Sequence, residues 1–220
     1  MTQDSDERRP GMPRQVDHAE RRRRIADAVC ELADERGLEG VTLRDVAARA
    51  EVSMGAVQRC FRTKEEMLVF ALGHIGERIG ARVRARLVRS PAQSAGTALG
   101  HAATEVALLR EEHRAEARVW LAFVAQAAVS EVLARTVQAN YAALQESFAR
   151  LIEEARADTG AAAGARADAG RAAPLDPRRE ARALLALADG LTTHVLIGHL
   201  TPPREAEDVL HTHLARLLPQ

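Results

Sequence analysis

Two short helical patterns lie on either side of Glu51-Val52-Ser53, within the segment VTLRDVAARAEVSMGAVQRCF at residues 41–61. Thr42 and Ser53 each stand where a hydroxyl can cap the first turn of a helix. Helices this short are marginal in isolation, so they form only where longer helices pack against them. The segment therefore predicts a helix-turn-helix unit that neighbouring helices support.

The remainder of the chain also consists of helical patterns. No segment combines strict alternation of polarity with β-branched residues, so we expect no strands. The expected fold class is all-α, with an N-terminal three-helix domain that contains the helix-turn-helix and a larger helical domain after it. Helix start and stop signals place about nine helices, near residues 17–36, 43–50, 54–60, 64–88, 91–110, 113–129, 131–157, 177–200 and 204–218.

Composition divides the chain into a tail and two domains. Residues 1–16 are polar and lack the apolar core of a signal peptide, so we expect a disordered tail. Residues 17–64 would form the helix-turn-helix domain and residues 65–220 the larger domain, in which the small-residue segment 157–176 would be a flexible surface loop. No apolar run approaches the ~18 residues of a membrane span, so we expect no membrane partner and a cytoplasmic protein.

Charge is distributed unevenly along a chain that is neutral as a whole. The 31 basic and 31 acidic residues argue against a non-specific polycation. Residues 41–64 nevertheless hold five bases against two acids, and Lys64 is the only lysine of the chain. A local basic surface beside a helix-turn-helix indicates binding to double-stranded DNA. The five bases are Arg44, Arg49, Arg59, Arg62 and Lys64.

The second short helix is the expected DNA-reading element. Gln58 and Arg59 carry the groups that can read base edges in a major groove. Thr42 and Lys64 would bind phosphates, as would the first amides of the helix after Thr63. The alternative is an ordinary packed helical turn, which the combination of signals disfavours. The candidate DNA-binding residues are Thr42, Arg44, Ser53, Met54, Gly55, Ala56, Gln58, Arg59 and Lys64.

The segment GLEGVTLRDVAARAEVSMGAVQRCFRTKEEML resembles the N-terminal domain of the TetR/AcrR family of bacterial transcriptional repressors. The resemblance implies a homodimer that binds operator DNA and is released from it by a small lipophilic effector. Three positions depart from the family pattern. Glu51 stands where the family usually has Gly, so some backbone strain is expected there. Gln58 replaces a common Tyr, and Cys60 replaces His, Tyr or Phe.

Four of the six aromatic residues fall within residues 120–148 of the larger domain. From the residues alone, an aromatic stripe at helical spacing more often indicates a core than a cavity. The resemblance favours a cavity for an effector, because domains of this kind typically hold one. The candidate ligand-binding residues are Trp120, Phe123, Gln126, Ala127, Tyr141, Leu144, Phe148 and His194.

The last two helices are apolar around much of their circumference. Such helices suit a twofold four-helix interface, and they resemble the dimerising pair of the family. Burial within one chain is the alternative. The candidate interface residues are Leu184, Leu187, Leu191, Val195, Leu210, Leu214 and Leu217.

Other sites are not expected. His194 and His199 are five residues apart and should not share a helical face, and no cysteine or carboxylate completes a metal site near them. We find no nucleophile, phosphate-binding glycine loop or carboxylate pair of an enzyme, so we expect neither catalysis nor a cofactor. A helical adaptor for protein partners, or a ligand-binding protein that no longer reads DNA, remains the alternative. Arg21 to Arg24 could either contact DNA or form a solvated face.

Overall fold

The computed structural model describes residues 14–89, 94–158, 175–200 and 202–218. Within these ranges the chain forms nine α-helices, one short 3-10 helix and no strand, which confirms the all-α prediction. The elements are α1 (Arg14–Arg36), α2 (Leu43–Arg49), α3 (Met54–Cys60), α4 (Lys64–Arg89), α5 (Ala95–Val106), η1 (Glu111–His113), α6 (Arg114–Ala127), α7 (Glu131–Asp158), α9 (Pro177–Leu196) and α10 (Arg204–Leu217).

Several helix ends differ from the predicted ones. α1 begins at Arg14, so residues 14–16 are helical and do not belong to a tail. α5 begins at Ala95, where the Ser94 hydroxyl caps its first turn, and the start that we predicted near residue 91 lies outside the described residues. The expected tail at residues 1–13 and most of the expected loop, residues 159–174, also lie outside them.

Two helices end earlier than predicted because the backbone turns left-handed. Leu108 adopts φ +50°, which ends α5 before residue 110. Gly198 adopts φ +76°, a conformation that glycine takes without steric penalty, and α9 stops at Leu196 instead of continuing to residue 200. The amide of His199 then donates to the carbonyl of His194 at 2.9 Å, as in a glycine-terminated helix end.

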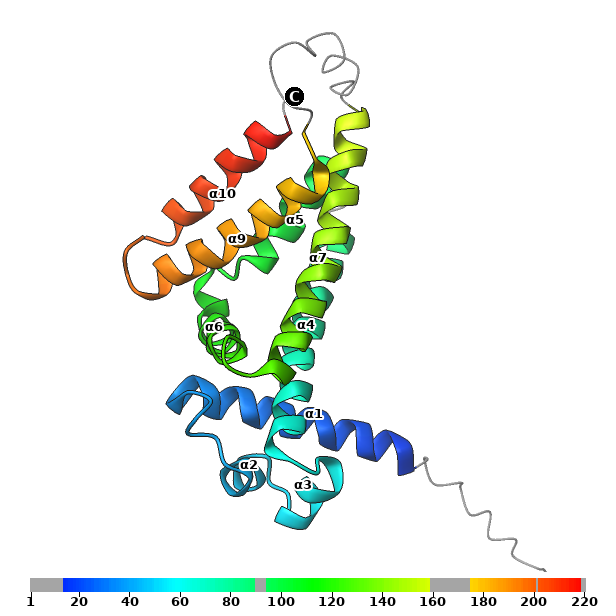
Figure 1. The fold of residues 1–220 in the computed structure, drawn as a ribbon, viewed down its shortest axis with the longest axis vertical. Coiled ribbons are helices and arrows are strands. Elements are labelled where there is room, and N and C mark those ends of the chain that lie inside the picture. The colour runs from blue at the N-terminus through cyan, green and yellow to red at the C-terminus, as the bar shows by residue number, and fades with distance from the viewer. Residues whose placement is uncertain (1–13, 90–93, 159–174, 201, 219–220) are drawn as a thin grey trace, which may run out of the picture.

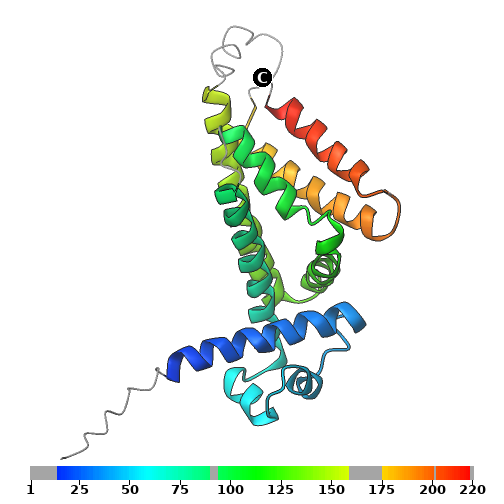
Figure 2. The ribbon, with the colours of Figure 1, turned by 180° about the vertical axis from the view of Figure 1, so that it is seen from behind.

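The helices form a small end and a large end (Figure 1). α1, α2 and α3 gather at the small end, and α4 runs from there along α7 into the larger group of helices. Seen from behind, α9 and α10 lie side by side on one flank of the large end, and α6 lies close to α1 (Figure 2). α4 and α6 are thus the two elements that contact both ends.

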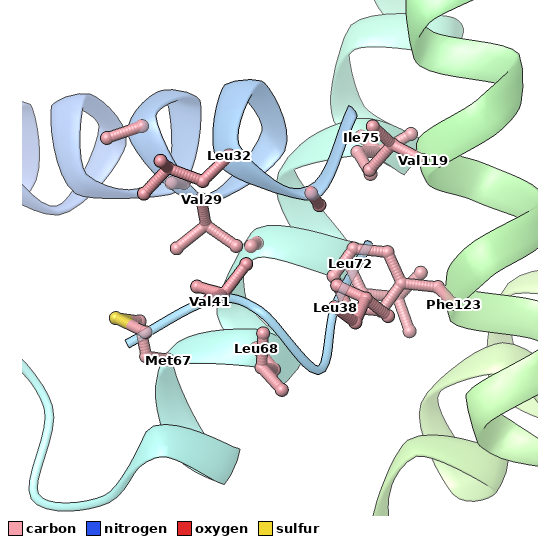
Figure 3. Packing of buried hydrophobic residues seen from close by; sticks show 14 of the residues in the cluster. Val29, Leu32, Leu38, Val41, Met67, Leu68, Leu72, Ile75, Val119 and Phe123 are labelled. Atoms are coloured by element: carbon pink, nitrogen blue, oxygen red, sulfur yellow. The ribbon is translucent and has the colours of Figure 1, made fainter. Parts of the chain in front are cut away.

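The core consists of two clusters of buried side chains. The first includes α1 to α4 and continues into α6 and the start of α7. Figure 3 shows Phe123 of α6 beside Leu38 and Leu72. The second cluster joins α5, α7, α9 and α10. Because α6 contributes to the core of the small end, a movement of α6 must repack that core.

Among the described helices, none combines the length and apolar character that crossing a bilayer would require.

Candidate functional site

The turn between α2 and α3 has a strained residue at its centre. Glu51 adopts φ +52°, in the left-handed region that residues with a Cβ rarely occupy, as expected from its place at a glycine position. The amide of Val52 donates to the carbonyl of Ala47 at 3.0 Å, which closes the turn. Arg24 on α1 donates to the carbonyl of Ala50 at 2.8 Å. The turn is therefore held from both sides of Glu51.

Both predicted caps of the short helices are formed. The Thr42 hydroxyl accepts from the amide of Asp45 at 3.2 Å, and it donates to the Asp45 carboxylate at 2.8 Å. The Ser53 hydroxyl accepts from the amide of Ala56 at 3.1 Å. Each cap satisfies an amide that the first turn of a helix leaves unpaired. Thr42 and Ser53 are exposed, so each hydroxyl can also face a neighbouring molecule.

The outer face of α3 carries the predicted base-reading groups. Met54 is 38% exposed, and Gln58 and Arg59 are exposed as well. Gly55 is half-buried. Ala56 was expected on this face, but it is 7% exposed and packs inward, because α3 turns that position toward the core. The exposed face of α3 therefore consists of Met54, Gln58 and Arg59, with Ser53 at its start.

The local basic charge is partly neutralised within the protein. Arg49 contacts Glu31 at 3.1 Å and Glu35 at 2.8 Å, and these hydrogen bonds raise the pKa of Arg49 and lower that of Glu35. Arg49 is thus engaged by α1. Arg44 and Arg59 are exposed and form no side-chain ion pair within the described residues. Their positive charges remain available to an anionic partner.

Lys64 is held by the connection between α1 and α2. Its Nζ lies 3.3 Å from the carbonyl oxygen of Leu38 and 3.4 Å from that of Glu39. The ammonium has three N–H groups, so one remains for a further acceptor such as a phosphate. Lys64 therefore ties the start of α4 to this connection in addition to any role on DNA.

The arginine run at the start of α1 has structural contacts. The Arg22 guanidinium lies 4.7 Å from the ring centre of Phe61 and 4.3 Å from that of Phe70, a cation–π arrangement over both rings. Arg24 holds Ala50, and Arg23 lies 4.0 Å from Glu20. The positive charges of Arg22 and Arg24 therefore have partners within the helix-turn-helix end.

A cavity of about 650 Å³ lies within the larger group of helices, bounded by α4, α5, α6, α7 and α9. This volume falls in the range of small-molecule sites, which is roughly 300–1,000 Å³. Four predicted residues line it: Trp120, Tyr141, Leu144 and Phe148.

The cavity exists partly because α4 lacks side chains where it faces α7. Gly73, Gly76 and Gly80 are spaced by three and four residues, so they lie on one helical face, and all three line the cavity. A Cβ added at Gly76 would lie 3.6 Å from the Asn140 amide nitrogen, with no closer contact. A glycine inside a helix costs about 0.5–1 kcal/mol relative to alanine. The sequence analysis missed these glycines, although their spacing was visible.

The other four predicted ligand residues do not line the cavity. Phe123 is fully buried in the core of the small end, because its face of α6 points toward α4. Gln126 lies in a separate surface hollow beside Lys64, and Ala127 packs against the first core cluster. His194 is exposed. Its ring lies 4.9 Å from that of His199, contrary to our expectation, because the chain turns back after Leu196.

The polar centre of the cavity is Asp189, which the sequence analysis did not single out. The Trp120 indole nitrogen donates to Asp189 Oδ1 at 3.1 Å, and the Tyr141 hydroxyl donates to Oδ2. The two rings meet edge to face with centres 5.8 Å apart. Burial raises the pKa of Asp189, which the two donors partly offset, and burial together with Asp189 raises the pKa of Tyr141. The sequence signal that could have identified Asp189 is an acidic residue within the largely apolar helix α9.

The predicted interface side chains are mostly buried within one chain. All but Leu187 are 8% exposed or less, because they pack against α5 and α7 in the second core cluster. Six of the predicted side chains are thus packed within one chain: Leu184, Leu191, Val195, Leu210, Leu214 and Leu217. The exposed positions of α9 include three small residues, Ala183, Ala186 and Gly190, besides arginines in its first turns and His194 near its end.

Ion pairs connect the cavity helices to α1. Arg78 of α4 lies 3.6 Å from Asp27 of α1 and 3.3 Å from Glu116 of α6. Arg118 of α6 pairs with Asp34 of α1 through two contacts, of which the Nη2–Oδ2 distance is 3.0 Å. Trp120 lines the cavity two residues after Arg118. α6 therefore touches both the cavity and the helix-turn-helix end.

Within the described part of the chain, no cluster of three or more His, Cys, Asp or Glu residues could hold a metal ion.

Two protein-family models match this chain, one over the helix-turn-helix end and one over the larger group of helices. Residues 25–69 match the family model described as bacterial regulatory proteins, tetR family. Residues 95–219, more than half of the chain, match the model described as BetI-type transcriptional repressor, C-terminal.

Individual relatives match over different lengths. The HTH-type transcriptional regulator PksA of Bacillus subtilis is 36% identical over 53% of this chain and 56% of its own. The HTH-type transcriptional repressor KstR of Mycolicibacterium smegmatis is 48% identical over 29% of this chain and 31% of its own. The matches thus span about half or less of these curated relatives. The crystal structure of a transcriptional regulator from Rhodococcus sp. Rha1 is 31% identical, with a TM-score of 0.71 over 90% of this chain and 95% of that one.

Proposed function

The chain belongs to the TetR family of bacterial regulatory proteins, and we propose on this basis that it is a homodimeric transcriptional repressor. It would bind operator DNA through α3 and leave the operator when a small molecule occupies the cavity. The observation that carries the proposal is the connection of an exposed, capped α3 with a cavity of about 650 Å³ through two shared helices, α4 and α6.

The exposed face of α3 supports sequence-selective binding. Gln58 can form a paired contact with adenine, and Arg59 with guanine. Ser53, Thr42, Arg44 and the free N–H of Lys64 surround it with phosphate-binding groups. Met54 would contact the groove by its apolar surface.

A homodimer would use the exposed surface of α9 and α10. The small residues of α9 allow a second helix to approach closely, and Ile197 is 71% exposed just after its end. α10 adds Val209, which is 44% exposed. A twofold dimer would present two α3 helices to half-sites about 34–36 Å apart. The substitution Gly190→Arg places a bulky charge on this surface and should convert the dimer into monomers, as measured by sedimentation velocity. Ala81→Arg, on the exposed face of α4, is the control and should leave the dimer intact.

The proposed release is a shift between two states. DNA would favour one spacing of the α3 helices, and a ligand in the cavity would favour another, transmitted by α4 and α6. A ligand can shift this equilibrium only by its difference in affinity for the two states.

The direct test is fluorescence anisotropy on DNA from upstream of the protein's own gene and from neighbouring promoters, with shuffled DNA as the control. Selective binding whose affinity falls steeply with salt supports the proposal. Equal, weak binding to every duplex would contradict it and favour a helical protein that binds partners or ligands without reading DNA.

A further inference from the structure

Asp189 is a carboxylate without a counter-charge. Both of its oxygens accept hydrogen bonds, one from Trp120 and one from Tyr141, and both donors are neutral groups. Among the residues that the structure describes, no arginine, lysine or histidine lies within 4.0 Å of it. Hydrogen bonds of this kind favour the ionised form of a carboxyl group. A partly buried carboxylate in this state gains from an added positive charge.

The rings beside Asp189 suit a cation as well. Trp120 and Tyr141 place two aromatic rings next to the carboxylate, with centres 5.8 Å apart. An aromatic face attracts an ammonium group, and tryptophan does so most strongly. The remaining charged residues of the wall are Glu77 and Arg84, both exposed, so the lining as a whole carries one excess negative charge.

The cavity is larger than an ammonium group needs. Its volume is about 650 Å³, and most of its wall is apolar: Val83, Leu87, Leu144, Phe148, Leu151 and Leu185. A small hydrophilic cation would leave that apolar surface unfilled. A ligand with an extended apolar body would bury it and gain the corresponding transfer free energy.

From these contacts we propose that the effector is an amphiphilic organic cation. Its ammonium head would lie on the cavity side of this cluster, against Asp189 and the rings of Trp120 and Tyr141, and its apolar body would extend along the glycine face of α4. This inference rests on the proposed function only in treating the ligand as the effector. The ligand class itself can be tested separately from DNA binding.

Trp120 is the only tryptophan of the chain, so its intrinsic fluorescence reports occupancy of the cavity without a label. The probes are octyltrimethylammonium, octan-1-ol and octanoate, which share the chain and differ in charge, together with tetramethylammonium as the head alone. We expect octyltrimethylammonium to bind at least tenfold more tightly than each of the other three. Octanoate or octanol binding as tightly would overturn the assignment of a cation, and tetramethylammonium binding as tightly would overturn that of an apolar body.

The variant Asp189→Asn removes the charge while it keeps the size of the side chain. It should weaken octyltrimethylammonium at least tenfold and change octanol by less than about threefold. Glu77→Gln, which removes the exposed carboxylate of the same cavity, is the matched control and should have the smaller effect. Circular dichroism melts establish that each variant is folded, and Tyr141→Phe, which keeps the carboxylate and the ring, should retain the preference for the cation. A cation affinity that is unchanged in a folded Asp189→Asn would refute the proposal.

Operator binding in the same samples separates the two proposals. Cation binding without release of DNA would contradict the proposed effector mechanism and leave the ligand class standing. Selective DNA binding by a protein that does not bind the cation would contradict the proposed ligand class and leave the DNA-binding function standing.

Discussion

Arg118 of α6 and Asp34 of α1 form a two-contact ion pair that links a wall of the cavity to the helix-turn-helix end. The pair raises the pKa of Arg118, since its guanidinium donates to the carboxylate. The next cavity residue, Trp120, follows within one turn of the same helix. A displacement of Trp120 by a ligand would therefore reach α1 through a single rigid element.

Arg118→Ala should reduce the effect of a ligand on operator affinity more than it changes ligand affinity itself. Substitutions along a coupling route alter coupling by roughly 0.5–2 kcal/mol, which is about 2- to 30-fold. The measurement is operator affinity with and without saturating ligand. Arg135→Ala removes an exposed ion pair with Glu131 that lies within α7 and does not involve α1, and it serves as the control. Equal coupling in both variants would exclude the pair from transmission.

Arg59 and Lys64 should affect DNA binding in different ways. Arg59→Ala should cost about 1–3 kcal/mol on the operator and much less on shuffled DNA, because a base contact is lost. Lys64→Ala should weaken both duplexes alike and lower the salt slope by about 1, because a phosphate contact is lost. Anisotropy titrations across a salt series measure both effects. An Arg59 effect of the same size on both duplexes would rule out base reading.

Glu51→Gly should stabilise the protein. Its φ of +52° is unfavourable for a residue with a Cβ by about 1–2 kcal/mol, and the greater freedom of glycine in the unfolded chain offsets part of the gain. We expect an increase of up to about 1 kcal/mol in the free energy of unfolding, measured by urea denaturation. Glu51→Ala, which retains the Cβ, should show no such gain. Stabilisation by alanine instead would indicate an unfavourable charge and not backbone strain.

Gly76→Ala should raise the free energy of unfolding by about 0.5–1 kcal/mol, because alanine is the better helix former and its Cβ meets only ordinary contacts. Gly76→Leu should fill the cavity and reduce ligand affinity at least tenfold while operator binding persists. Gly100→Ala on α5, where an added Cβ meets nothing within 4 Å, controls for helix propensity away from the cavity. Undiminished ligand binding by the leucine variant would place the ligand elsewhere.

The stability of Asp189→Asn relative to the unaltered protein should depend on pH. Burial raises the pKa of Asp189 above its ordinary 3.8, so the folded chain binds more protons than the unfolded one between these two pKa values. Its contribution to stability therefore falls as the pH rises from about 3.8 through the folded pKa. The asparagine variant should gain relative stability over that window and level off above it, in denaturation curves taken at several pH values.

Three other ionisable groups line the same cavity, namely Tyr141, Glu77 and Arg84. The raised pKa of Tyr141 keeps its hydroxyl neutral in this window. Glu77→Gln is the control for the remaining carboxylate. A stability difference that is flat with pH would mean that Asp189 ionises as readily in the folded chain as in the unfolded one.

Local chemistry was readable from the sequence. The caps at Thr42 and Ser53, the exposed Gln58 and Arg59, and the bounds of α3 all follow from side-chain hydrogen bonding and helical period, which act within a few residues. The strain at Glu51 was predicted from the family resemblance, which places a glycine at this position of the turn.

Contacts between distant segments were decided only by the tertiary structure. The helical period of the sequence showed that Trp120 and Phe123 are apolar positions of one helix. It did not show that Trp120 lines the cavity whereas Phe123 packs into the core of the small end. Asp189 gained its role only when folding brought it to Trp120 and Tyr141, 69 and 48 residues away. Leucines of α9 and α10 face inward because α5 and α7 cover them, and periodicity alone does not specify which neighbour covers an apolar face.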